Sequence, residues 1–206
     1  MMMVGLTMVA HGNHEVMELA PQWSSLEDLL AAHPQLRLDL GCGWVKEPGY
    51  VGLDDLRGVG GLAGQSAADG RGPDVFLDLS ADRWPFADGS VSEVRSRHFL
   101  EHSLLDHVFD ESHRVLRRGG TFVAIVPYAN SADGMSPGHN VFLTERFFEL
   151  NPSFQAQFAI TQITYRQSDE WLRWPRLLRR LIPFDWARVH LFNVCKEMRV
   201  EAVRRG

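Results

Sequence analysis

The chain has 206 residues, of which 45% are hydrophobic and 23% charged, a composition typical of a single globular domain. No apolar run approaches the roughly 18 residues of a membrane span, so a membrane-spanning helix is not expected. The two cysteines, Cys42 and Cys195, lie far apart, which argues against a disulfide framework or a thiolate zinc site and fits a cytoplasmic location. The net charge of -5 disfavours a dedicated nucleic-acid binder.

Taken in chain order, the first half alternates between helical and strand patterns. Residues 23–32 are expected to form a helix, because leucines repeat at helical spacing and Ser24 with Glu27 makes a capping-box pattern. Five short apolar runs then predict strands buried on both faces, at residues 36–40, 50–53, 74–79, 91–96 and 121–127. A helix with an apolar face from Leu105 to Leu116 separates the last two, whereas residues 56–73 are expected to be a loop in place of a crossover helix.

The pattern changes after residue 127. Residues 128–140 are expected to form an irregular loop, 144–150 a short amphipathic helix, and 158–166 and 198–204 two antiparallel strands that close the sheet. Between those strands, arginines alternate with Trp and Leu side chains, and Pro175 and Pro183 interrupt the segment. Three interpretations remain open: a solvated face over a core stripe, which we favour, a lid for an anionic acceptor, or a membrane-surface helix. The arginines in question are Arg173, Arg176, Arg179 and Arg180.

The strongest chemical signal is the segment LDLGCG, in which a buried strand ends in a turn containing Gly41 and Gly43. Glycine there allows the backbone to pass close to a ligand. The next strand ends at Asp54, whose carboxylate can accept hydrogen bonds from ribose hydroxyls, and a third strand is followed by Asp78 and Leu79, which can read an adenine edge. Together these residues predict a nucleoside site at the carboxyl edge of a parallel sheet.

In order along the chain, LDLGCG, YVGLD, LDLSADRWPFADGSVSEV, HFLEH and HRVLRRGGTFVAIVP resemble the motif series of type 11 class I S-adenosylmethionine-dependent methyltransferases. The resemblance implies S-adenosylmethionine as the cofactor. It places Asp39, Gly41, Cys42 and Gly43 along the methionine part, with Arg97 and His98 beside the methyl donor. Asp54 would bind the ribose, with Asp55 as the alternative acid, and Asp78 with Leu79 the adenine.

Two other classes of enzyme have motifs that share part of this pattern. A nicotinamide enzyme needs a third glycine and an acid about twenty residues further on, whereas Asp54 follows Gly41 after only thirteen residues. The segment HFLEH matches the HxxEH pattern of zinc hydrolases, with His98 and His102 as ligands and Glu101 as base. Because the segment directly follows a strand rather than lying within a helix, no metal site is expected.

The acceptor is expected to be a small molecule or saccharide methylated on oxygen or nitrogen. The (D/N)PPY pattern of amino-methylating DNA enzymes is absent, since Tyr128 follows Val126 and Pro127. If a general base is used, the candidates are His139, His98 and Tyr128. The alternative function is a methyltransferase-like protein that binds a nucleoside or a partner without catalysis.

These elements predict an α/β fold with a Rossmann-like, mostly parallel sheet of seven strands, helices on both faces and shortened first crossovers. We expect one domain over residues 1–206. It would comprise an N-terminal helical segment (1–35), a cofactor-binding core (36–127), and an acceptor-side loop, helical insertion and closing strands (128–206).

Overall fold

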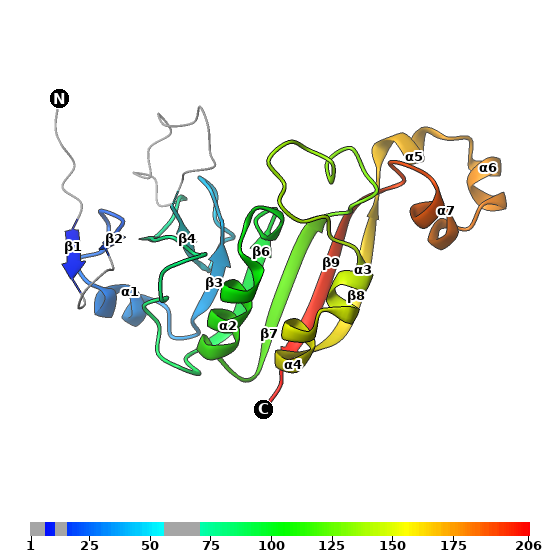
Figure 1. Cartoon of the computed structure of the whole chain (residues 1–206). Helices are drawn as coiled ribbons and strands as arrows, with labels where there is room; N and C mark the ends of the chain where they lie inside the picture. The colour runs from blue at the N-terminus through cyan, green and yellow to red at the C-terminus, as the bar shows by residue number, and fades with distance from the viewer. Residues whose placement is uncertain (1–6, 11–15, 56–70) are drawn as a thin grey trace, which may run out of the picture.

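The computed structural model describes residues 7–10, 16–55 and 71–206. Within these residues, nine strands form one sheet in the order β1-β2-β5-β4-β3-β6-β7-β9-β8 (Figure 1). The strands are β1 (Thr7–Ala10), β2 (Val16–Leu19), β3 (Arg37–Leu40), β4 (Val51–Asp54), β5 (Val75–Phe76), β6 (Val91–Arg97), β7 (Leu116–Pro127), β8 (Phe158–Gln167) and β9 (Cys195–Arg204). The helices are α1 (Leu26–Ala32), α2 (Leu105–Val115), α3 (Glu145–Leu150), α4 (Pro152–Gln157), α5 (Asp169–Arg173), α6 (Arg176–Leu181) and α7 (Phe184–His190), with a 3₁₀ turn at Leu100–His102.

The five central strands, β5, β4, β3, β6 and β7, are parallel, as the short apolar runs predict. Leu38, Leu40 and Leu53 lie on one face and are completely buried, and the alternating Asp39 and Asp54 on the other face are at most 8% exposed, so this part of the sheet is covered on both faces. At one edge β9 and β8 close the sheet in antiparallel orientation, also as expected. The carboxyl ends of all five parallel strands therefore meet at one edge of the sheet.

The expected number of seven strands is too low. All seven are present, but the hairpin of β1 and β2 pairs with β5 in antiparallel orientation and extends the sheet by two strands. The segment 1–35, expected to be helical, therefore holds a hairpin as well as α1. Each hairpin strand has only four residues, too short for an alternating pattern to stand out from the apolar start of the chain.

The first crossover is shortened, as expected, and an ion pair takes the place of a crossover helix. Residues 41–50, between β3 and β4, contain no helix. Lys46 Nζ lies 2.6 Å from both carboxylate oxygens of Asp74, which is fully buried and also accepts from the Trp23 indole and the Gly52 amide. These contacts tie the short loop to the start of β5. The expected loop at 56–73 lies largely outside the described residues.

Helices α2 and α4 cover β7 through a cluster of phenylalanines. The rings of Phe109 (α2), Phe122 (β7) and Phe154 (α4) pack at centroid distances of 5.1 to 6.0 Å. Figure 1 shows α2, α3 and α4 on the same side of the strands. This packing orients β6 and β7 so that the loops after both strands reach the same edge.

The start of α1 differs from the sequence pattern. Helix α1 begins at Leu26, and its cap is Ser25, which accepts from the Asp28 amide at 3.1 Å. The expected cap, Ser24, hydrogen bonds instead to the Asp28 carboxylate. Neighbouring serines give the same pattern one residue apart, so only the backbone conformation distinguishes them.

The arginine-rich segment forms three short helices, α5, α6 and α7, separated at Pro175 and Pro183 as expected. The favoured interpretation, a solvated arginine face over a core stripe, is wrong for α6, in which no residue is buried. Leu177 and Leu181 are 70% and 71% exposed. No helix among the described residues is long and apolar enough to cross a membrane.

Candidate functional site

The turn after β3 brings the backbone close to an adjoining cavity. Gly41 and Gly43 have φ values of 61° and 56°, in the left-handed region that glycine tolerates best. A side chain at Gly41 would also overlap the ring of Phe99. The Gly43 amide donates to the Asp54 carboxylate at 2.7 Å, so the turn is held against the end of β4.

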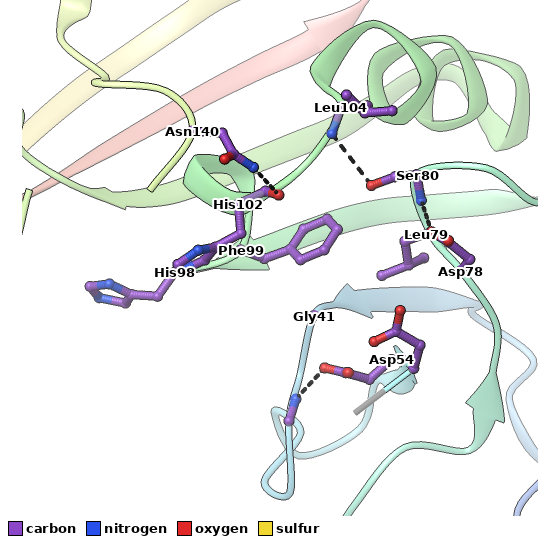
Figure 2. A pocket seen from close by; sticks show the side chains of 12 residues that line it. Gly41, Asp54, Asp78, Leu79, Ser80, His98, Phe99, His102, Leu104 and Asn140 are labelled. Atoms are coloured by element: carbon purple, nitrogen blue, oxygen red, sulfur yellow. Dashed lines mark hydrogen bonds between the residues drawn. The ribbon is translucent and has the colours of Figure 1, made fainter. Parts of the chain in front are cut away.

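The cavity next to this turn has a volume of about 540 Å³, within the range of roughly 300 to 1,000 Å³ typical of small-molecule sites. It lies at the carboxyl edge of the parallel strands, where α/β sheets bind ligands (Figure 2). It is lined by Gly41, Gly43, Asp54, Asp55, Asp78, Leu79, Ser80, His98, Phe99, His102, Leu104 and Asn140. Six of the residues that the sequence analysis assigned to the cofactor therefore share one cavity: Gly41, Gly43, Asp54, Asp78, Leu79 and His98.

Both acids at the end of β4 line the cavity, but they differ in burial. Asp54 is only 8% exposed and is held by the Gly43 amide, whereas Asp55 is exposed. At the end of β5, the Asp78 carboxylate accepts from the Ser80 amide at 2.9 Å. Of the two β4 acids, Asp54 is the better positioned, since its carboxylate is fixed beside the glycine turn.

Asp39, Cys42 and Arg97 line a second, smaller cavity of about 230 Å³, which shares Gly41 with the first. The Asp39 carboxylate accepts from the Glu47 amide at 2.8 Å, and burial raises its pKa above the usual value. Burial, together with nearby carboxylates, also raises the pKa of the Cys42 thiol, so this cysteine is not a nucleophile. The sequence placed these residues with the rest of the cofactor site, and the structure puts them beside it.

His98 directly follows β6 and lines the large cavity in a left-handed conformation with φ 53°. Its Nδ1 lies 3.6 Å from the Glu101 carboxylate and its Nε2 lies 3.0 Å from that of Glu197. These two carboxylates outweigh partial burial and raise the pKa of His98 above its ordinary value. His98 is therefore held towards the imidazolium form, which makes it a poor general base.

His139 does not line the cavity but packs against His102, which does. The two imidazole rings are 4.7 Å apart at their centroids, edge to face. His102 Nδ1 donates to the Gly138 carbonyl and His139 Nδ1 to the Gly134 carbonyl, both at 3.0 Å. Each ring therefore presents Nε2 as a proton acceptor.

The HxxEH alternative does not have the geometry of a helical zinc site. His98 belongs to a strand exit and contacts Glu197, whereas His102 ends a 3₁₀ turn and contacts the loop at Gly138. A different cluster forms instead, since ligand atoms of Glu101, His102 and His139 lie within 4.8 Å of one another. The sequence analysis did not pair His102 with His139, because the two segments meet only when the loop 128–140 folds back over the 3₁₀ turn.

Tyr128 is excluded as a general base. It is buried, and its hydroxyl donates to Glu145 at 3.1 Å and accepts from Arg188 at 3.0 Å. Burial and the neighbouring Glu145 carboxylate raise its pKa to about 12. Tyr128 thus joins the loop after β7 to α3 and α7 and does not reach the cavity.

Five lining residues were not assigned to the methyltransferase site from the sequence, although His102 was named as a ligand in the zinc alternative: Ser80, Phe99, His102, Leu104 and Asn140. Asn140 donates from Nδ2 to the His102 carbonyl at 2.9 Å, and Ser80 accepts from the Leu104 amide at 3.4 Å. The position of Phe99 and His102 directly after β6 was a usable signal, because every residue at a strand exit of this edge can face the site.

The lining has the groups that a sulfonium nucleoside requires. A cavity bounded by side-chain-free turn residues admits the chain of the ligand, a fixed carboxylate at Asp54 can accept from two ribose hydroxyls, and Leu79 offers an apolar surface for a base. Along the sheet order β5-β4-β3-β6-β7-β9-β8, only β9 runs against the other six strands.

Comparisons with known proteins also indicate a methyltransferase. Residues 38–124 match the family described as "Methyltransferase domain". None of the curated proteins compared with the chain matches its sequence. The family match over residues 38–124 supports a class I S-adenosylmethionine-dependent methyltransferase with S-adenosylmethionine as its cofactor.

Solved structures share the fold at low sequence identity. A S-adenosylmethionine-dependent methyltransferase from Archaeoglobus fulgidus has a TM-score of 0.60 at 15% identity, over 83% of this chain and 86% of that one. A geranyl diphosphate C-methyltransferase from Streptomyces coelicolor A3(2) has a TM-score of 0.54 at 14% identity, over 86% and 78%. A 16S rRNA (adenine(1408)-N(1))-methyltransferase from Catenulisporales acidiphilia has a TM-score of 0.53 at 14% identity, over 85% and 88%.

Proposed function

We propose that this methyltransferase transfers a methyl group to oxygen or nitrogen of a small molecule or saccharide. The observation that carries the proposal is that the cavity lining outside the assigned cofactor residues includes three polar side chains, Ser80, His102 and Asn140, which we call the polar rim. Hydroxyl and amine acceptors need such hydrogen-bonding partners, whereas an acceptor carbon would be better served by an apolar rim. The solved structures with this fold include both small-molecule and RNA methyltransferases, so the fold does not identify the acceptor. The proposal therefore rests on the polar side chains of the rim.

For the cofactor, the arrangement supports the roles that the family resemblance implies. Gly41 and Gly43, with Asp39, Cys42 and Arg97 behind them, would border the methionine part, Asp54 the ribose, and Asp78 with Leu79 the adenine. His98, held towards its charged form, would bind an anionic group near the methyl donor.

When bound, S-adenosylmethionine would supply a methyl group on a sulfonium: an acceptor lone pair forms a bond to the methyl carbon as the carbon–sulfur bond breaks in line and the neutral thioether leaves. The protein's contribution is to align the acceptor, exclude water and accept a proton. His102 and His139 would accept that proton. His102 is the one that lines the cavity and would contact the acceptor, and His139 packs on it and would hold its ring in place.

The test is methyl transfer from S-adenosylmethionine labelled on the methyl group. Purified protein would be incubated with panels of sugars, hydroxylated small molecules, small amines, RNA and proteins. Label in a sugar or small molecule, attached through oxygen or nitrogen, is the expected result. Label in RNA, in a protein or on carbon would contradict the proposal. Cofactor binding with no transfer to any panel would favour the non-catalytic alternative.

A further inference from the structure

The helices α5 to α7 expose an unusual surface, which we call the Arg-Leu surface. Eight large apolar side chains between residues 172 and 192 are at least 41% exposed: Leu172, Trp174, Leu177, Leu178, Leu181, Trp186, Val189 and Phe192. Only a small cluster of Trp171, Ala187 and Val194 is buried beneath them. Contiguous exposed apolar surface of this kind marks an interaction site rather than ordinary solvent-facing protein.

Positive charge predominates on this surface. Between Leu172 and Phe192 the sequence has five arginines, at 173, 176, 179, 180 and 188, against one acidic residue, Asp185, which pairs with Arg188. No ion pair to the other four arginines is found within the described part of the chain. Arginines without ion pairs, next to exposed leucines and tryptophans, are suited to bind a lipid layer, which is apolar inside and can be anionic at its surface.

We propose that the Arg-Leu surface docks on the surface of an anionic lipid bilayer. The leucines would enter the boundary between headgroups and acyl chains, the tryptophans would lie at headgroup depth, and the arginines would contact lipid phosphates. A second copy of this chain is a poorer occupant, because two such surfaces would bring like charges together. The prolines at 175 and 183 divide the segment into short helices that can lie flat on the bilayer.

The docking surface is joined to the acceptor side of the site. The Asn193 amide donates to the Asn130 carbonyl at 3.0 Å, and Asn130 Nδ2 donates to the Leu191 carbonyl at 2.9 Å. Asn130 belongs to the loop 128–140, which also carries His139. Figure 1 shows this loop and α5 at the same edge of the sheet. Docking would therefore bring the acceptor side of the cavity towards the lipid.

The experiment is co-sedimentation of the full chain with vesicles of phosphatidylcholine containing phosphatidylglycerol, and with vesicles of phosphatidylcholine alone. We expect binding to the anionic vesicles that weakens at high salt. Arg176→Glu with Arg180→Glu should reduce the partition coefficient at least about tenfold, because two attractive charges become repulsive. The matched control is Arg117→Glu with Arg118→Glu, the same charge change at exposed positions at the opposite edge, which should bind as wild type.

A second pair separates the apolar contribution from charge. Leu177→Ser with Leu181→Ser should weaken vesicle binding at least about tenfold, whereas Phe142→Ser with Leu150→Ser, also exposed, should not. Unchanged S-adenosylmethionine affinity confirms that each variant is folded. Absence of binding to anionic vesicles, or equal loss in the control variants, would overturn the proposal. So would a concentration-dependent dimer that the Leu177→Ser and Leu181→Ser variant abolishes, since the surface would then bind a second copy.

Discussion

At the scale of single residues, the chemistry of the candidate site depends on the hydrogen-bond and ionic partners of a few side chains. Asp54 is nearly buried and fixed by the Gly43 amide, whereas Asp55 at the same strand end is exposed. His98 faces two carboxylates, and His102 and His139 face backbone carbonyls. The same residue type, histidine, thus has anionic partners in one place and neutral carbonyl partners in another.

Asp54→Ala should weaken S-adenosylmethionine binding by at least about tenfold. Each lost charge-assisted hydrogen bond to a ribose hydroxyl costs roughly 1.5 to 3 kcal/mol. Titration calorimetry measures the change. Asp54→Asn keeps an acceptor for the Gly43 amide and separates loss of the turn from loss of ribose contacts, and Asp55→Ala is the positional control. Wild-type affinity in Asp54→Ala with a loss in Asp55→Ala would assign the ribose to Asp55.

His139→Ala and His102→Ala should each lower methyl transfer by at least tenfold and leave S-adenosylmethionine affinity unchanged. General base catalysis contributes roughly 10²- to 10⁴-fold. Steady-state kinetics with the acceptor from the labelling panel would measure the effect. We expect His139→Gln, which keeps a side chain that can pack on His102, to retain more turnover than His139→Ala. Full turnover in both alanine variants would exclude the histidine pair.

Purified protein should carry no stoichiometric transition metal. The two HxxEH histidines have different partners, Glu197 for His98 and the Gly138 carbonyl for His102, so they do not form the zinc-binding pair that the motif requires. Elemental analysis after expression without added metal is the measurement. About one zinc per chain that disappears in His102→Ala would instead assign a metal to the cluster of Glu101, His102 and His139.

At the scale of elements, α2 is locked to the segment before β6 by one nearly buried ion pair. Arg114 donates to both Glu111 carboxylate oxygens, at 2.6 and 2.7 Å, and to the carbonyls of Trp84 and Phe86. The Trp84 amide in turn donates to Glu111 at 2.7 Å. This network fixes the helix that leads from the site strand β6 to β7.

Arg114→Met should lower the free energy of unfolding by about 3 kcal/mol, because it leaves the Glu111 carboxylate buried without its cation. The control Arg199→Met, which removes an exposed pair with Glu201, should cost less than about 1 kcal/mol. Urea denaturation followed by fluorescence compares the two. A similar small effect from both substitutions would mean that the network does not stabilise α2.

The same network sets a pH dependence. Burial alone would raise the pKa of Glu111, but Arg114 and the Trp84 amide outweigh it and hold that pKa below its usual value. The network therefore stabilises the fold above the unfolded pKa of about 4.3, and this contribution is lost as pH falls through the lower folded pKa. Thermal melts should show a smaller loss of stability below pH ~4 in Glu111→Gln than in wild type. An equally steep loss in both proteins would assign the acid sensitivity to other carboxylates.

At the scale of the whole molecule, charge is divided along the chain. From Tyr165 onward there are ten Lys or Arg against five Asp or Glu, whereas the rest of the chain is strongly acidic. The sheet places α5 to α7 at the β8 edge, and the cofactor cavity begins at β3. Four strand spacings of about 4.8 Å separate these positions, roughly 19 Å.

Because that separation exceeds the Debye length of about 8 Å at physiological salt, the tail arginines should not affect cofactor binding. Replacing Arg173, Arg176, Arg179 and Arg180 together by glutamine should leave S-adenosylmethionine affinity within about threefold. Calorimetry in physiological salt is again the measurement. A larger loss would show that this segment closes over the donor.

The sequence by itself determined the central sheet and predicted six of the residues that line the candidate cavity. Short apolar runs, a double-glycine turn and strand-end acids are local patterns, and parallel strands must bring their carboxyl ends to one edge. It also determined that Pro175 and Pro183 break the tail into short helices. Each of these inferences needs only neighbouring residues.

Only the tertiary structure decided the rest, because contacts between distant segments leave no local pattern. The hairpin of β1 and β2 becomes part of the sheet only by pairing with β5. The ring of His102 packs against that of His139, and hydrogen bonds to Glu145 and Arg188 hold the Tyr128 hydroxyl away from the cavity. Leucines at helical spacing look the same whether they are buried or exposed. Among the described residues, none buries the leucines of α6, and these leucines therefore stay exposed on the Arg-Leu surface.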